Sequence, residues 1–457
     1  MNTIDMKEEI LKTGEAAEFL NVGRATITIE KTLKFKLIPL TKNDKRELQS
    51  LLNDYTDMLQ EALDLIMTHD VRTRKKAHEL CYAYLRSKFP HLHNKFIQEA
   101  YKRALAMYKS YRKLMSKWRR SPKKGKPSPP KVENNCTIEL HIDTFRLEKE
   151  HSILTIKGNN RIKFLVMEYE YAVEELHSAS IKNSKVVVGD SILLLLTIRK
   201  QKEVGNHENK IFIDLNEDTV DCLFVDYGKK RAVLFTIKHD IRRIRMNYRR
   251  INKRIEEKVK GKRKKLLGKY GKRERKRVED RLKKITTLLA EVGNKVKADL
   301  VREELKDMRD NSITHSRQLN FRLNRFPYRK FAFYADYKFY ERGLNVIEVE
   351  PKDTSITCPI CGHKSKSNRV SKEEFRCKKC GFEFNAQYVA ALNLFSRFDD
   401  GEVTIRGGRL CLATRKAGSV VPVDEASDEV LIQNDALRGK PVQKLLQIIG
   451  VTEVAKI

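Results

Sequence analysis

The chain has 457 residues, which is enough for about three domains with a substantial core. Hydrophobic residues make up 40%, which argues against a fully disordered chain, and no run of 18 uncharged apolar residues exists that could cross a membrane. Lys and Arg number 94 against 61 Asp and Glu, so the formal net charge is +33. So large a charge repels itself unless a polyanion neutralises it, and nucleic acid is the partner that it favours.

The first 30 residues are predicted to form a short helical segment. The opening MNTIDMKEEILKTGEAAEF is acidic and lacks an apolar core, so it is not expected to be a secretory signal, and the protein is expected to stay in the cytosol. Residues 14–28 also resemble a small helix-turn-helix, although a complete DNA-reading domain needs three helices and a larger core. An amphipathic helix is the alternative.

The next two hundred residues predict a barrel with a helical insertion. Residues 32–41 alternate apolar and polar side chains, which is typical of a strand. From residue 43 to 118 leucines and tyrosines recur every three or four positions, which predicts helices with breaks at 69–72 and 89–93. Residues 136–200 are rich in β-branched side chains and predict antiparallel strands of a small barrel, which the first strand joins.

Two basic segments are candidates for nucleic-acid contact. Residues 118–131, WRRSPKKGKPSPPK, predict an irregular loop that is either a flexible linker or a phosphate-gripping loop. The candidate contact residues in it are Trp118, Arg119, Arg120, Lys123, Lys124 and Lys126. Residues 242–285 carry the densest positive charge and predict two helices with a hairpin between them. They form either a nucleic-acid rail or a solvated arm, and the net charge of the chain favours the rail.

Four cysteines have the spacing of a structural zinc site. Cys358, Cys361, Cys377 and Cys380 spell C-x2-C, fifteen residues, C-x2-C, with a glycine after each pair. Each C-x2-C places two thiolates on one tight turn, and the glycine allows the backbone to fold back. Four thiolates complete a tetrahedron without an open position, so this zinc builds structure and does not catalyse.

Two acids mark a candidate magnesium site in the second half of the chain. Strands alternating with helices after residue 210 predict an α/β domain with a mixed sheet. Asp214 follows the apolar residues 211–213, and Glu303 follows a second short strand. An acid at the end of a buried strand is costly unless a cation compensates it, and Mg²⁺ prefers hard oxygen ligands. Helix-capping or salt-bridged acids are the alternative.

The motifs together resemble the TnpB proteins of insertion-sequence transposons, which are similar to compact type V CRISPR effectors. TLKFKLIPLT and the leucine-rich helix after it resemble the opening of the family. IDLNEDTV with Asp214, and ADLVREELKDMRD with Glu303, resemble the first two motifs of its RuvC-like nuclease. Residues 324–362, which end in the first C-x2-C pair, are the most specific part of the resemblance. FNAQYVAALNLF resembles the third motif. The likeness covers most of residues 31–397.

The resemblance implies an RNase H/RuvC-like mixed sheet with an inserted zinc ribbon, plus the small β-barrel with its helical insertion. The implied domains are a helical segment at 1–30, a barrel at 31–42 and 132–203, a helical nucleic-acid-recognition insert at 43–131, a nuclease domain at 204–356 and 382–398, a zinc ribbon at 357–381 and a tail at 399–457. The implied partners are a guide RNA and a target DNA, with no membrane, and the implied metals are structural zinc and catalytic magnesium.

The third motif departs from the family pattern. The family usually has an aspartate where this chain has Gln387, and an asparagine where it has Val389; Asn385 is also neutral. An amide carries no charge to neutralise Mg²⁺, so metal binding and cleavage are expected to weaken. Asp399 and Asp400 lie about 18 Å along the predicted helix and cannot substitute, whereas Glu383 could if its loop bends.

Three functions are therefore compatible with the sequence. The favoured one is a transposon-associated RNA-guided DNA endonuclease with Asp214 and Glu303 as metal ligands and Gln387 at the third position. The second is a nuclease-impaired RNA-guided DNA-binding protein that acts as a repressor or targeting factor. The third is an unguided nucleic-acid-binding accessory protein of the transposon.

Overall fold

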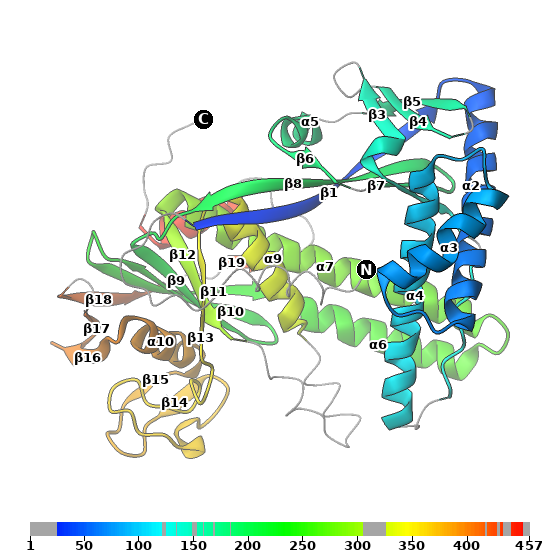
Figure 1. Cartoon of the computed structure of the whole chain (residues 1–457). Coiled ribbons are helices and arrows are strands. Elements are labelled where there is room, and N and C mark those ends of the chain that lie inside the picture. Colours follow the sequence, from blue (N-terminus) through cyan, green and yellow to red (C-terminus); the bar gives the residue numbers. More distant parts are fainter. Residues whose placement is uncertain are drawn as a thin grey trace. The chain divides into compact units, whose positions relative to one another are not determined.

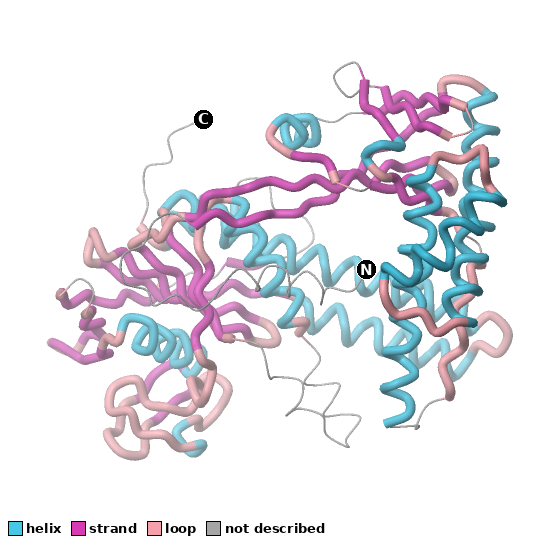
Figure 2. The backbone as a smooth tube through the Cα atoms, viewed as in Figure 1, coloured by secondary structure: helices cyan, strands magenta, loops and turns pink. Residues whose placement is uncertain are grey.

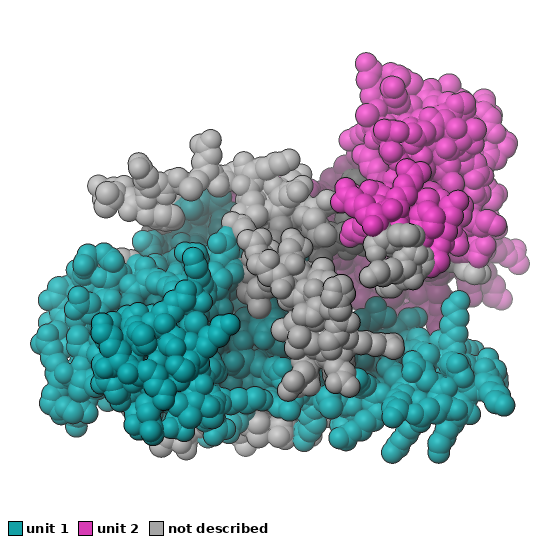
Figure 3. All heavy atoms as spheres, turned by 90° about the horizontal axis from the view of Figure 1, so that it is seen from below, with its two compact units in different colours: residues 1–27, 202–457 teal, residues 28–201 magenta. Residues whose placement is uncertain are grey.

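The computed structural model describes most of the chain as two compact units (Figure 3). The described residues are 25–120, 125–133, 135–148, 153–158, 160–167, 170–182, 184–304, 326–415, 418–426, 430–432 and 440–450. One unit comprises residues 28–201, and the other comprises 1–27 and 202–457. Most of the predicted helix-turn-helix lies outside the described residues. None of the described helices combines the length and apolar character that a membrane crossing requires.

Three helices fill the first half of the 28–201 unit (Figure 1). They are α2 (Lys42–Thr68), α3 (Arg74–Lys88) and α4 (Asn94–Arg120), and they confirm the predicted helices and the breaks between them. Thr41 caps α2, because its hydroxyl accepts a bond from the Asp44 amide and the Asp44 carboxylate accepts one from the Thr41 amide. Leucines at three- and four-residue spacing bury the inner face of α2 against α4.

The strands of the same unit form one sheet with antiparallel pairs. They are β1 (Ala25–Pro39), β2 (Thr137–Leu140), β3 (Phe145–Glu148), β4 (Ile153–Lys157), β5 (Arg161–Met167), β6 (Ser180–Ile181), β7 (Ser184–Val188) and β8 (Ile192–Val204), with helices η1 (Ile142–Thr144) and α5 (Glu170–His177) between them. The long strands β1 and β8, labelled in Figure 1, are drawn in magenta like the other strands in Figure 2. The order is β2-β7-β8-β1-β5-β4-β3, with β6 beside β8. The predicted first strand therefore joins the later strands. The predicted closure into a barrel stays a prediction.

A mixed sheet forms the centre of the other unit. Its strands are β9 (Asn209–Leu215), β10 (Thr219–Asp226), β11 (Arg231–His239), β12 (Ala298–Glu303), β13 (Val346–Val349), β16 (Glu402–Arg406), β17 (Arg409–Thr414), β18 (Ser419–Glu425) and β19 (Val430–Ile432). The order is β13-β12-β9-β10-β11-β18-β17-β16, with β19 also on β11. β9, β10 and β11 run antiparallel, whereas β12 runs parallel to β9 and β13 parallel to β12. The sequence predicted a mixed sheet but missed β11, and it predicted residues 399–457, which include β16–β19, only as a tail.

Helices cover both faces of this sheet. They are α6 (Ile241–Lys258), α7 (Arg263–Val296), α9 (Tyr328–Glu341), α10 (Ala386–Asp399) and α11 (Lys440–Ile448). Ile211 and Ile213 of β9 pack toward α7, α9 and α11, whereas Phe212 packs toward α10. This alternation is the two-residue period of a strand that is buried on both faces. Each face therefore has its own core, and the parity of a position decides which helix a side chain meets.

The predicted basic helix pair is confirmed with one change. α6 and α7 run antiparallel, and the turn between them contains Gly261, but Gly268 and Gly271 lie inside α7. The predicted irregular loop after the helical insert also begins later than expected. Trp118 to Arg120 form the last turn of α4, because the helical pattern continues to that point, and the described loop follows from residue 125.

Candidate metal centres and nucleic-acid interface

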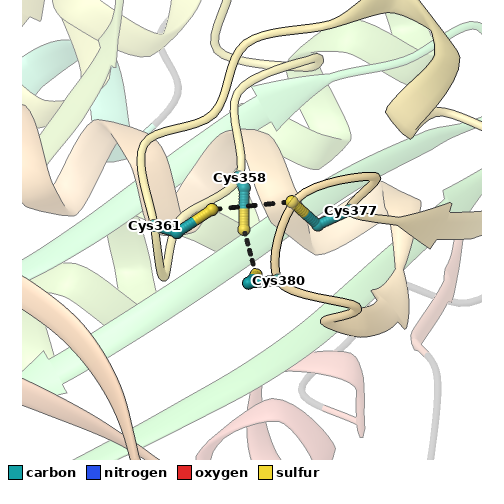
Figure 4. Close-up of side chains that lie close together, drawn as sticks. All are labelled: Cys358, Cys361, Cys377 and Cys380. Atoms are coloured by element: carbon teal, nitrogen blue, oxygen red, sulfur yellow. Dashed lines mark hydrogen bonds between the residues drawn. The ribbon is translucent and has the colours of Figure 1, made fainter.

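The four predicted cysteines converge on one point (Figure 4). Their sulfur atoms all lie within 4.8 Å of one another, with Cys358 to Cys380 at 3.7 Å and Cys361 to Cys377 at 3.5 Å. Tetrahedral zinc with bonds of about 2.3 Å needs sulfur separations of roughly 3.8 Å. Among the described residues, this is the one group of three or more His, Cys, Asp or Glu side chains placed to hold a metal ion. The group could therefore bind one zinc.

Local backbone geometry makes the cysteine cluster. Gly362 and Gly381, directly after each C-x2-C pair, have φ of 67° and 72°, a conformation that a Cβ would strain. The side chain of Asn368, the buried last residue of the short helix η2 (Lys366–Asn368), donates to the carbonyls of Ile356 and His363 and accepts from the Lys378 amide. It thereby joins the two knuckles. The hairpin of β14 (Glu374–Arg376) and β15 (Glu383–Asn385) then leads into α10.

The structure brings the two predicted acids to one edge and one face of the mixed sheet. β12 pairs with β9 in parallel with Arg302 opposite Ile213, so Glu303 lies beside Asp214 one residue further on. Asp214 lies two residues after Phe212, and Glu303 two residues after Val301. Both acids are therefore on the same face of the sheet as those apolar residues, the face that α10 covers. The carboxyl ends of parallel strands meet at a common edge, where ligands of open α/β sheets bind.

Both carboxyl groups have a raised pKa. Burial, followed by the neighbouring charges of Glu303 and Asp221, raises the pKa of Asp214 to about 7. Burial also raises the pKa of Glu303, against a hydrogen bond from Thr354, whose hydroxyl lies 2.7 Å from the carboxylate. A pair of acids that resists ionisation is a pair that a cation would stabilise.

A third acid, Asp221, lies beside Asp214 on β10 and was missed by the sequence analysis. It is fully buried, yet both carboxylate oxygens already have donors: the Thr236 hydroxyl at 2.6 Å, and the Thr219 hydroxyl and Asn216 amide at 2.7 and 2.9 Å. The Asn216 amide also donates to Asp214 at 2.9 Å. Asp221 therefore shares the Asn216 amide with Asp214, and among the described residues the three acids do not form a group close enough to hold one metal ion. An acid inside the apolar run TVDCLFV was the signal available in the sequence.

The neutral third position lies in the first turn of α10. Asn385 caps this helix by accepting a bond from the Gln387 amide, and α10 packs on β9, β10 and β12. Val389 is buried in apolar surroundings with the zinc knuckles. Asn393 fixes the other side of α10, because its amide donates to the carbonyls of Thr354 and Thr357.

The acids considered as substitutes are engaged elsewhere. Glu383 is exposed on β15 and forms an ion pair with Arg376 at 2.8 Å. Asp399 is buried at the end of α10, where it accepts a bond from the Arg415 amide. Asp400 forms an ion pair with Arg415 at the surface. Within the described residues the carboxylate pair thus has no third acid that completes it.

Charge effects link the pair to three further groups of this unit. Arg369, which lies between the two cysteine pairs in the sequence, lowers the pKa of Asp214, although burial and the two acids outweigh it. Arg397 of α10 lowers the pKa of Glu303 in the same way. Tyr328, the first residue of α9, has its pKa raised to about 12, by burial first and then by Asp214 and other acids. Groups from three separate parts of the chain therefore lie within electrostatic range of the pair.

The other predicted contact residues lie in the 28–201 unit. Trp118 is half-buried in the last turn of α4, and Arg119 and Arg120 beside it are exposed. Lys126 is exposed in the loop that follows. Lys123 and Lys124 lie outside the described residues. The structure thus presents three exposed basic side chains of the predicted group.

Comparison with known proteins supplies the family. The model of the Cas12f1-like TNB domain matches residues 328–394, from α9 through the zinc knuckles to α10, and the model of the uncharacterised protein family MJ0013 matches residues 51–145. The fold resembles that of Cas12f1 in the cryo-EM structure of a Cas12f1–sgRNA–target DNA complex, with a TM-score of 0.51 at 14% identity. That likeness covers 80% of this chain and 98% of the other.

Two curated relatives extend the comparison. The CRISPR-associated endodeoxyribonuclease Cas12f1 of Sulfoacidibacillus thermotolerans is 33% identical over 95 residues, which are 21% of this chain and 22% of that protein. The TnpB-like protein MJ0751 of Methanocaldococcus jannaschii is 31% identical over 247 residues, 52% of this chain and 87% of the relative. The sequence motifs, the fold and the extent of this last match together show that the chain belongs to the TnpB family.

Proposed function

We propose that this chain is an RNA-guided DNA-binding protein of the TnpB type whose RuvC-like nuclease centre is incomplete. The observation that carries the proposal is the pair of Asp214 and Glu303 on one face of the sheet, covered by α10, which has Gln387 where the family usually has its third acid. One relative is named as a Cas12f1 endodeoxyribonuclease, and the similar solved structure is a Cas12f1–sgRNA–target DNA complex. Both names support guide RNA and target DNA as the partners of this chain.

Residues of this chain would hold a catalytic Mg²⁺ ion at the centre. Asp214 and Glu303 would hold Mg²⁺, with Asn216 orienting Asp214 and Thr354 orienting Glu303. A divalent ion there supplies Lewis-acid stabilisation and an activated water for phosphodiester hydrolysis. Gln387 offers one neutral oxygen where a carboxylate would help to neutralise the ion. Metal affinity and cleavage are therefore expected to fall by several orders of magnitude relative to a three-acid site.

The charge of the chain and the elements of the other unit support the same proposal. The net charge of +33 favours a polyanion, and the helices and sheet of the 28–201 unit would grip a guide duplex by its backbone while base pairing reads the target. Trp118, Arg119, Arg120 and Lys126 would contribute to that grip, and zinc at the four cysteines would hold the segment before α10. The protein would act in the prokaryotic cytoplasm.

An active RNA-guided endonuclease is the second candidate. The presence of both Asp214 and Glu303 favours it, because a centre without a catalytic role has no need to keep two buried acids side by side. Arg369 and Arg397 also lie within electrostatic reach of the pair, where they could contact a phosphate.

Purified protein with its co-expressed RNA separates these candidates. The RNA is sequenced, and binding and linearisation of a plasmid with a matching target are measured in Mg²⁺. We expect one discrete RNA, guide-dependent binding, little linear product from the wild type, and faster cleavage by Gln387→Asp. The matched control Gln387→Asn changes the size of the side chain in the same way without adding a charge, and should not cleave faster.

Three results would contradict the proposal. Rapid wild-type cleavage that Asp214→Ala abolishes would establish the active endonuclease. Cleavage that Gln387→Asn accelerates as much as Gln387→Asp would show that charge at this position is irrelevant. A random pool of bound RNA would favour the unguided accessory protein.

A further inference from the structure

A cleft of about 210 Å³ lies between α6 and α7, the antiparallel helix pair in Figure 1, and neither the two acids nor the four cysteines line it. The polar side chains that line it are Asp240, Arg243, Asn247, Tyr248, Arg277 and Arg281. Arg243, Asn247 and Arg277 are exposed, whereas Tyr248 and Arg281 are buried at 5% and 2% exposure. The cleft thus has a rim of guanidinium and amide groups above a buried floor.

The floor is held rigidly. The Arg281 guanidinium donates to Asp240 at 2.7 Å and to Asp280 at 2.7 Å. Asp240 begins α6 but makes no capping bond with its side chain, which accepts from Arg243 at 3.2 Å instead. Burial would raise the pKa of Asp240, but Arg281 and Arg243 hold it below its usual value. The acid therefore stays charged and fixes two of the three arginines in position.

The third arginine is fixed by an aromatic ring. The Arg277 guanidinium lies 5.8 Å from the centroid of the Tyr248 ring, within cation–π range. Because a stacked guanidinium is planar and presents its N–H groups outward, it can pair with a phosphate in two-pronged fashion or stack on a base. Asn247 beside it supplies both a donor and an acceptor for a base edge.

The surroundings favour an anionic ligand. α6 and α7 carry 21 Lys and Arg against 6 Asp and Glu. Within the cleft lining, three arginines face one aspartate. A volume of about 210 Å³ is several times the roughly 30 Å³ that one water occupies, so the cleft has room for a phosphate together with part of the nucleotide attached to it. Unpaired nucleotides with exposed base edges are a feature of RNA loops and bulges, whereas a target strand in a guide duplex is paired.

We propose that this cleft binds one unpaired nucleotide of the RNA, with Arg243 and Arg277 on its phosphate and Asn247 on its base. The proposal rests on RNA being a partner, as under the proposed function, but it requires neither a guide-matched target nor cleavage. It assigns a specific role to a segment that the net charge alone would describe as a general basic rail.

The test uses the full-length protein after bound RNA is removed at high salt. The probes are a fluorescein-labelled 12-nucleotide single-stranded RNA, the corresponding 12-base-pair RNA duplex, and single-stranded DNA of the same sequence. The variants are Arg243→Gln and Arg277→Gln. The matched control is Arg273→Gln, which removes a charge one turn earlier in α7, where the side chain lies over Tyr270 and does not line the cleft.

We expect each cleft variant to weaken binding of single-stranded RNA at least tenfold and binding of the duplex less than threefold. The control should weaken both probes by a similar small factor. For the single strand, the plot of log binding constant against log salt concentration should also become less steep by about 0.7 in each cleft variant. Unchanged melting temperatures would show that the variants fold.

Equal losses for the cleft variants and the control would overturn the proposal, because they would reduce the cleft to general charge. Equal losses for single strand and duplex would show that no unpaired nucleotide is recognised. Equal losses for single-stranded DNA and RNA would overturn the assignment to RNA. A failed guide or cleavage assay alongside the expected selectivity would contradict the proposed function and leave the cleft assignment standing.

Discussion

Replacing Asp214 with asparagine is expected to stabilise the metal-free protein at alkaline pH. Burial, with the charges of Glu303 and Asp221, raises the pKa of Asp214 from 3.8 to about 7. The folded protein therefore keeps a proton that the unfolded chain releases near pH 4. The stability contributed by this protonated carboxyl is present below pH 4 and is lost as the pH rises through about 7.

The size of the effect follows from the two pKa values. They differ by about three pH units, and each unit corresponds to about 1.4 kcal/mol, so the upper limit at pH 8 is roughly 4 kcal/mol. The exposed part of the side chain reduces this value through solvent screening. At roughly 2 °C per kcal/mol for a unit of this size, Asp214→Asn should raise the melting temperature by about 3–8 °C at pH 8.

Thermal unfolding in EDTA at pH 5 and pH 8 measures this difference. At pH 5 the folded wild type keeps this proton while the unfolded chain is already largely ionised, so only about 1.7 kcal/mol of the difference is present and the gap in melting temperature should be less than half of that at pH 8. Asp218→Asn is the control, because Asp218 lies in the following turn and pairs with Arg242 at the surface. A variant that melts equally far above the wild type at both pH values, or below it at pH 8, would refute the reasoning. Mg²⁺ should narrow the gap at pH 8 by stabilising only the carboxylate form.

Three further outcomes test other parts of the structure. Cys377→Ser should abolish binding of one equivalent of zinc, measured by metal analysis, while a chelator should release that equivalent from the wild type. Gly293→Ala should lower stability by about 1–2 kcal/mol in thermal unfolding, because the added methyl group would lie 3.0 Å from a ring carbon of Phe339 and from a backbone oxygen; an increase would show that the helix adjusts. Asp221→Ala should lower stability by roughly 2–4 kcal/mol, because the Thr236 hydroxyl and two other donors lose their acceptor; an unchanged melting temperature would contradict this.

Local patterns made part of the architecture predictable. The cysteine spacing identified all members of the thiol cluster, because two C-x2-C turns each place a pair of ligands within a few residues. The leucine repeat identified α2 to α4, because the helical period is a property of neighbouring residues. The apolar runs that end in Asp214 and Glu303 likewise identified β9 and β12.

Other parts depend on contacts between distant segments. The strand β11 and the hairpins β16–β18 complete the mixed sheet through pairings that no short pattern encodes. Asn216 and Thr354 were missed because each acts only on a carboxylate brought to it by the fold. The cleft between α6 and α7 requires Asp240 and Arg281 to meet, 41 residues apart.

By itself, the sequence determined the class of partner, the thiol cluster, the family resemblance and the neutral residue at position 387. Each of these is a matter of composition or spacing, which survives without coordinates. Only the tertiary structure decided that Asp214 and Glu303 share a face, that Asp221 is already satisfied by other donors, and that Glu383, Asp399 and Asp400 are engaged elsewhere. Two carboxylates can share an ion only if their strands are neighbours and their side chains point to the same face of the sheet. Both conditions arise only when β12 pairs with β9 across more than eighty intervening residues.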